Sequence, residues 1–228
     1  MESITQEVLE EVIDLVKFGP ETRTLTHPED RRQTAVHELG HGVLTVVLKT
    51  NPLHRVSLVS RSDFLGISEA LPDENRRHQH RDYWLRRIAI ALGGRAAEEL
   101  VYGSAAGQTP GVESDLEQAT WIATQMVCRW GMVPELRGSF LRQREDYLGQ
   151  SESRSLFFSE STAREIDQAI QQILHAAERL AHATLERYQS RLADWATRLV
   201  DQEELTGDEV AALVQAADRA EMGSNTMA

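Results

Sequence analysis

The chain has 228 residues, of which 41% are apolar and 26% are charged, and its formal net charge at pH 7 is −12. This length can bury a core in one large domain or two small ones. The acidic excess argues against nucleic acid or an anionic membrane as a partner, because both attract basic patches. We find no apolar run of the ~18 residues that a membrane span needs and no signal-peptide pattern, which predicts a soluble, cytoplasmic chain.

The first part of the chain predicts two helices and a short sheet. Apolar residues at helical spacing predict a helix from about residue 4 to the Gly19-Pro20 stop. Pro28, a residue favoured in the first turn, opens a second predicted helix over about 28–49. Within 54–70, the segments RVSLVS and FLGISEA are rich in β-branched and apolar residues and predict strands. We expect FLGISEA at an edge of this sheet, with an internal position as the alternative.

The middle of the chain predicts two more helical segments. Residues 83–102 have a helical pattern that is interrupted or closely packed at Gly93-Gly94. A loop containing Gly and Pro follows, and we expect Ser114 to cap the next helix, which runs to about Trp130.

The last third predicts a helical region after a loop at about 131–158. Thr162 and Glu165 form a capping-box pattern ahead of a helical repeat that runs to Leu199, as one long helix or a helical hairpin. Thr206 and Glu209 form a second capping box, which opens a last short helix. The tail, residues 221–228, is expected to fray. The fold class is therefore mainly α with a small β-sheet.

The stretch VHELGHGV lies inside the predicted helix at 28–49. His37 and His41 are four residues apart, so a helix places both imidazoles on one face, where they can hold one Zn²⁺. Glu38 is rotated by about 100° from His37, which puts its carboxylate beside the metal as a general base. The alternative, two hydrogen-bonded core histidines, is less favourable because unligated imidazoles are costly to bury among apolar flanks. No Gly-rich phosphate-binding pattern is present, so we expect no nucleotide site.

A catalytic zinc needs a third protein ligand. The metzincin pattern would place Gly at position 44 and His at position 47, but the chain has Leu44 and Val47, so that class is excluded. The remaining carboxylates on apolar downstream helices are Glu98, Glu99 and Asp115. Spacing alone does not choose among them.

Two further segments carry a resemblance to a known family. LGGRAAEELVYG, residues 92–103, and SDLEQATWIATQMVCRWGM, residues 114–132, closely resemble the peptidase domain of FtsH, the membrane-anchored ATP-dependent zinc protease. The likeness extends from FGPETRTLTHPEDRRQTAVHELGH to TAREIDQAIQQIL and LTGDEV, and so covers nearly the whole chain. The chain departs from the family where it has HELGH in place of the usual HEAGH, and TPGVESD in place of a TGASND-like loop.

The resemblance implies a zincin-type metallopeptidase domain with a C-terminal helical bundle. It implies a zinc endopeptidase that acts on unfolded or extended polypeptides, with one zinc per chain held by His37, His41 and Asp115. Glu38 would then be the catalytic base. Glu98 is expected to orient a ligand histidine, and the alternative is a surface charge near Arg95.

The same resemblance implies a domain organisation. Residues 1–22 resemble the end of an ATPase lid, 23–150 would form the zinc-binding peptidase core, and 151–228 a helical region packed on that core. The implied partners are further copies in a homo-hexamer and an AAA ATPase module, at the cytoplasmic face of a membrane. The chain is then an excised fragment or a free-standing peptidase. A catalytically silent FtsH-like scaffold or assembly module is the alternative function, and the presence of all four site residues favours the enzyme.

Overall fold

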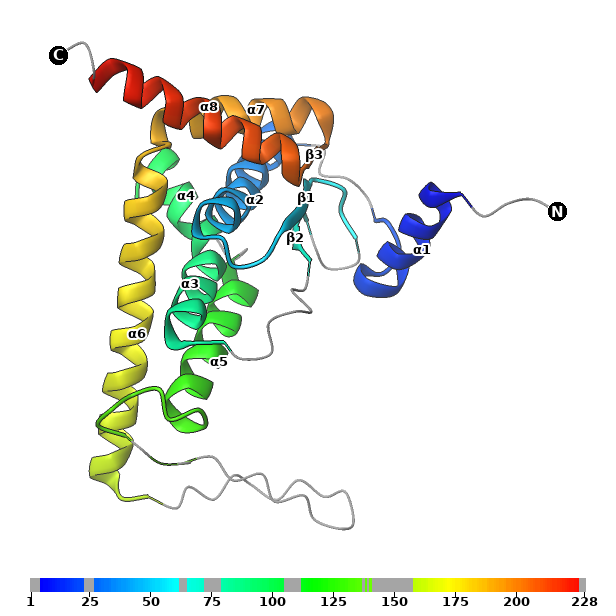
Figure 1. Cartoon of the computed structure of the whole chain (residues 1–228). Helices are drawn as coiled ribbons and strands as arrows, with labels where there is room; N and C mark the ends of the chain where they lie inside the picture. The colour runs from blue at the N-terminus through cyan, green and yellow to red at the C-terminus, as the bar shows by residue number, and fades with distance from the viewer. Residues whose placement is uncertain are drawn as a thin grey trace.

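A computed structural model of the chain describes residues 5–22, 27–61, 65–71, 79–104, 112–136, 138, 140 and 158–225. These residues form eight helices and one three-stranded sheet, which confirms the mainly helical fold (Figure 1). The helices are α1 (Gln6–Phe18), α2 (Pro28–Leu48), α3 (Arg81–Ala91), α4 (Gly93–Tyr102), α5 (Glu113–Cys128), α6 (Glu160–Glu186), α7 (Gln189–Gln202) and α8 (Gly207–Asn225). The strands are β1 (Leu53–Ser57), β2 (Ile67–Ala70) and β3 (Glu204–Thr206). Most of the predicted loop at 131–158 lies outside the described residues.

Helix α2 runs through the centre of the molecule and contacts α3, α4, α6, α7, α8 and two strands of the sheet (Figure 1). Pro28 occupies its first turn, as predicted. The acidic Glu29 and Asp30 beside it interact favourably with the positive, N-terminal end of the helix dipole. The helix ends at Lys49, whose backbone is left-handed with φ 51°. The predicted helix at 28–49 is therefore confirmed.

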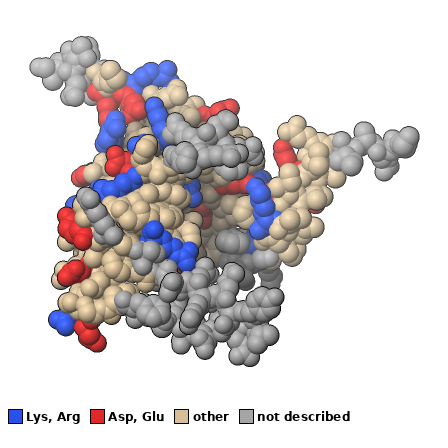
Figure 2. Space-filling view, turned by 60° about the horizontal axis from the view of Figure 1, so that its bottom comes forward, with Lys and Arg blue, Asp and Glu red and all other residues tan. Residues whose placement is uncertain are grey.

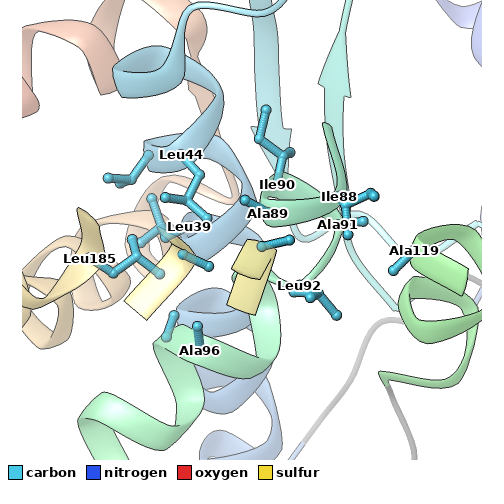
Figure 3. Packing of buried hydrophobic residues seen from close by; sticks show 14 of the residues in the cluster. Leu39, Leu44, Ile88, Ala89, Ile90, Ala91, Leu92, Ala96, Ala119 and Leu185 are labelled. Carbon is cyan, nitrogen blue, oxygen red and sulfur yellow. The ribbon is translucent and has the colours of Figure 1, made fainter. Parts of the chain in front are cut away.

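The hydrophobic core surrounds α2. Figure 3 shows Leu39 and Leu44 of α2 together with Ile88 of α3, Ala96 of α4 and Leu185 of α6. Four of these side chains are completely buried, and a buried aliphatic side chain contributes about 1.5–3 kcal/mol to stability. Leu39, the residue that departs from the HEAGH form of the motif, thus belongs to the core.

Small residues let α4 approach α2 closely. A Cβ atom on Gly40 would lie 2.2 Å from the carbonyl oxygen of Gly93, so only glycine fits at this crossing. The predicted helix at 83–102 is interrupted as expected, because α3 ends before Leu92 and α4 begins at Gly93. The break lets α4 take its own direction along α2.

The sheet is antiparallel, in the order β2-β1-β3. Val56 of β1 pairs with Ser68 of β2 on one side and with Leu205 of β3 on the other. Strand β2, which contains most of FLGISEA, therefore lies at an edge, as predicted. Strand β3 is an element that the sequence reasoning missed.

Two predicted helix starts are wrong. Helix α5 begins at Glu113, so Ser114 lies inside the first turn and does not cap it. Helix α6 begins after Ser159, whose hydroxyl accepts a hydrogen bond from the Thr162 amide at 3.3 Å, so Thr162 lies in the first turn. Ser159 precedes the predicted cap and offers the same hydroxyl, which is why it takes this role.

The last predicted capping box is present. The Glu209 amide donates to Thr206 Oγ1 at 3.3 Å, and the Thr206 amide donates to Glu209 Oε2 at 2.9 Å. Helix α8, expected to be short, has 19 residues and extends to Asn225; residues 226–228, the end of the tail that is predicted to fray, lie outside the described residues. Helix α7 crosses the end of α6 instead of running back along it (Figure 1).

Within the described part of the chain, none of the helices combines the length and the apolar character that crossing a membrane requires.

Candidate metal centre

The central helix presents two histidines toward one point. Nε2 of His37 and Nε2 of His41 lie 3.1 Å apart, one helical turn from each other on α2. Asp115, in the first turn of α5, brings its Oδ2 to 3.0 Å from His37 Nε2 and 3.2 Å from His41 Nε2. The structure therefore brings together the three residues that the sequence analysis named as metal ligands.

The other nitrogen of each ring has a hydrogen-bond partner. His37 Nδ1 lies 2.6 Å from Oε1 of Glu98, on α4, and His41 Nδ1 lies 2.7 Å from the carbonyl oxygen of Ile90, on α3. Both partners accept hydrogen bonds, so each Nδ1 carries a proton, and each Nε2 points to the common point, where a metal ion would replace any proton it holds. Glu98 is held in turn by Gln33, whose Nε2 donates to Oε2 at 2.8 Å.

Glu98 lies beside His37, as expected, and is not the surface charge of the alternative. It is 1% exposed, whereas its neighbour Glu99 makes the ion pair with Arg95, at 2.8 Å. The Ile90 carbonyl was missed by the sequence reasoning, because a backbone acceptor has no signature in side-chain types.

The three facing atoms fit a divalent cation. Asp115 Oδ2 is buried, and the Nε2 atoms of the two histidines face it. A buried carboxylate oxygen without a donor is costly unless it is paired or binds a metal. Tetrahedral zinc with bonds of 2.0–2.1 Å separates its ligand atoms by about 3.3 Å, close to the 3.0–3.2 Å triangle found here.

The cluster is strongly polarised. Burial alone would lower the pKa of His37, but the carboxylates of Asp115 and Glu98 outweigh it and raise that pKa from 6.5 to about 10. The pKa of His41 is also raised, because Asp115 outweighs the effect of burial. Burial opposes ionisation of Asp115, yet the two histidines hold the pKa of this carboxyl well below its usual range. The cluster therefore attracts positive charge, carried by protons or by a metal ion.

Glu38 lies beside the triad and faces the same cleft. Its burial raises the pKa of its carboxyl above the ordinary value, against the pull of the two histidines. Space around it is limited, since a Cβ atom on Gly66 would lie 3.0 Å from Glu38 Oε1. A Cβ atom on Gly94 would lie 2.3 Å from Cε1 of His37. The sequence reasoning did not single out these contacts, because they depend on tertiary approach.

A cleft of about 950 Å³ opens above the triad. Strand β2, at the edge of the sheet, forms one wall with Ile67–Ala70, and Ile90 and Ala91 of α3 also line the cleft. Lys17 and Phe18, at the end of α1, extend the lining. The cleft thus combines a sheet edge with a cluster of metal-ligand type.

Known proteins similar to this chain are named as zinc metalloproteases. A sequence model of Peptidase family M41 matches residues 24–213. ATP-dependent zinc metalloprotease FtsH of Thermobaculum terrenum is 37% identical over 207 residues, which are 90% of this chain and 32% of that protein. FtsH of Thermotoga maritima is 36% identical over 215 residues, which are 92% of this chain and 35% of that protein. FtsH 2 of Methylacidiphilum infernorum is 34% identical over 220 residues, which are 94% of this chain and 34% of that protein. The chain spans about a third of the length of these relatives. It belongs to peptidase family M41.

Proposed function

We propose that this chain is a zinc-dependent endopeptidase that binds one zinc through His37, His41 and Asp115. The observation that carries the proposal is the triangle of two Nε2 atoms and one carboxylate oxygen, 3.0–3.2 Å apart, at a cleft bordered by the edge strand β2. The relatives are named as zinc metalloproteases, which supports it.

Glu38 is the proposed general base. A zinc ion bound by the triad supplies Lewis acidity, which makes a water more acidic and polarises a peptide carbonyl. The Glu38 carboxylate would take a proton from the attacking water and pass it to the departing amine nitrogen. Burial raises the pKa of Glu38, which makes this group a better proton acceptor. Glu98 and the Ile90 carbonyl keep the two rings oriented.

Strand β2 is the proposed site for the polypeptide substrate. It pairs with β1 on one side, and the described residues place no strand on its other side. An extended peptide can add to such an edge through its backbone, while alternate side chains enter the cleft. A folded chain cannot present its backbone in this way, so unfolded or extended polypeptides are the expected substrates.

The wider assembly is also a proposal. The relatives are named ATP-dependent, and their additional length leaves room for an ATPase. We propose that an AAA ATPase module delivers unfolded substrate to this domain, and that residues 1–22 belong to the end of that module. A homo-hexamer at the cytoplasmic face of a membrane follows from the family resemblance. Figure 2 shows acidic and basic side chains interspersed on the described surface of one face. Such a mixed surface attracts nucleic acid less than a basic patch does.

Hydrolysis of unfolded casein tests the enzyme against the scaffold. We expect zinc near one per chain, cleavage that a chelator stops, and no turnover with Glu38→Gln although zinc stays bound. Cleavage that persists without metal, or in Glu38→Gln, contradicts the proposal. Bound zinc without cleavage by the unmodified chain would support the catalytically silent scaffold.

A further inference from the structure

Helix α1 projects from the body beside the sheet (Figure 1), and charged side chains hold it there. Asp14 of this helix is buried, only 5% exposed. Six large apolar residues of the helix are exposed instead; they are Val8, Leu9, Val12, Ile13, Leu15 and Val16. A helix that packed through a hydrophobic face would show the reverse pattern. Figure 2 shows acidic and basic groups where the projecting helix meets the body.

Arg55 of β1 is the centre of this attachment. Its Nη2 contacts Oδ1 of Asp14, its Nε lies 3.3 Å from Glu69 Oε2 on β2, and its Nη1 lies 3.3 Å from Glu204 Oε2 on β3. Arg61 Nη2 adds a second bond to Asp14, at 3.2 Å from Oδ2. One planar guanidinium therefore links α1 to all three strands, a geometry that a lysine could not reproduce.

Lys17 gives α1 a direct bond to the edge strand. Its Nζ lies 2.9 Å from Oε1 of Glu69, so the carboxylate of Glu69 is shared between Lys17 and Arg55. Glu69 is 9% exposed, and a buried carboxylate depends on such partners. Lys17, Phe18 and Glu69 all line the cleft that contains the metal-ligand cluster.

Strand β2 is a short edge strand that also packs on α2. It is four residues long and pairs with β1 alone among the described strands, with Arg55 opposite Glu69 in the register. Gly66, just before it, lies against Glu38. A shift of β2 would therefore move the edge on which an extended peptide binds and weaken that binding, and α1 is placed to prevent the shift.

We propose that α1 positions the substrate-binding strand: Asp14, through Arg55, and Lys17, through Glu69, hold β2 at the distance from the metal centre at which an extended peptide binds. This inference rests on the proposed peptidase function. It assigns a role in peptide binding to a helix that lies outside the family match at 24–213. Asp14 and Lys17 are positioning residues, because they act on the peptide through the strand.

The test compares steady-state constants of full-length, zinc-loaded variants on a fluorogenic peptide. Asp14→Asn and Lys17→Met remove one charge each, Lys17→Arg keeps the charge, and Glu11→Gln removes an exposed acid from the same helix as a matched control. We expect KM to rise at least about threefold in Asp14→Asn and Lys17→Met while kcat stays within about twofold, because the reacting groups are untouched. Lys17→Arg and Glu11→Gln should keep the unmodified KM.

Two results would overturn the inference. One is an unchanged KM in both Asp14→Asn and Lys17→Met. The other is a parallel loss of kcat and thermal stability, which would mean that α1 only stabilises the fold. Peptide affinity, measured by fluorescence anisotropy in a zinc-loaded Glu38→Gln background, must weaken by the same factor as KM rises. If the unmodified chain shows no turnover, the proposed function fails; if it turns over and Asp14 and Lys17 do not matter, this inference alone fails.

Discussion

His37 Nδ1 and Glu98 Oε1 lie 2.6 Å apart, although 61 positions of sequence separate the two residues. The contact joins α2 to α4, and Gln33, on α2 one turn before His37, holds the other oxygen of the same carboxylate. A carboxylate so placed fixes the tautomer of the ring and makes its second nitrogen a stronger metal ligand. Glu98 therefore belongs to the metal centre, although it does not face the metal position itself.

Glu98→Gln should weaken zinc binding by about 10- to 100-fold, because the amide keeps the shape but loses the charge that raises the basicity of His37. Competition with a fluorescent chelator measures the affinity. Glu99→Gln is the matched control, since Glu99 pairs with Arg95 and with His182 of α6 instead of a ligand histidine. Equal zinc affinity in Glu98→Gln and the unmodified chain would contradict this role.

Gly94→Ala should abolish stoichiometric zinc binding. The new methyl would lie 2.3–2.5 Å from three atoms of the His37 ring, so the ring must leave its position. Alanine favours a helix more than glycine does, so α4 itself should persist. Zinc content after gel filtration, together with far-UV circular dichroism, checks both expectations. A fully zinc-loaded variant would show that His37 does not need this position.

Gly66→Ala should separate binding from catalysis. Its methyl would lie 2.8 Å from Cγ and 3.0 Å from Oε1 of Glu38, and none of its three nearest atoms belongs to a ligand residue. We expect zinc binding to persist while kcat falls by about 10- to 100-fold, since small misplacements of a catalytic group have effects of that size. Comparing zinc content and peptide turnover of this variant with Gly94→Ala checks the difference. Loss of zinc in Gly66→Ala would assign Glu38 to the ligand set instead.

The metal-free chain should lose stability in alkali. The pKa of His37 is about 10 in the folded chain and 6.5 without its partners, so the folded state binds this proton more tightly. The stability that this proton contributes to the folded state is fully present below pH 6.5 and disappears as the pH rises to about 10. Thermal melts of chelator-treated protein should show a falling midpoint across this range. His37→Gln should flatten the profile, and a rising midpoint would contradict the polarised cluster.

The two histidine ligands could be predicted because they are close in sequence. His37 and His41 are separated by one helical turn, so periodicity alone places their nitrogens together. The third ligand is different. Spacing left Glu98, Glu99 and Asp115 open, since long-range proximity depends on how α4 and α5 pack on α2, and the family resemblance pointed to Asp115.

The remaining features depend on tertiary structure. The Ile90 carbonyl and the close approach of Gly94 to the His37 ring have no side-chain signature. Strand β3 has three residues, of which Leu205 alone is apolar, so it shows no alternation to detect. The division of the chain at residues 22 and 150 stays a prediction.

A crystal of the zinc-loaded chain, with diffraction recorded on both sides of the zinc absorption edge, tests the central claim most directly. We expect one anomalous peak per chain, at about 2.0–2.2 Å from Nε2 of His37, Nε2 of His41 and a carboxylate oxygen of Asp115. A fully zinc-loaded chain whose peak lies elsewhere, with Asp115 turned away from the two imidazoles, would contradict the account.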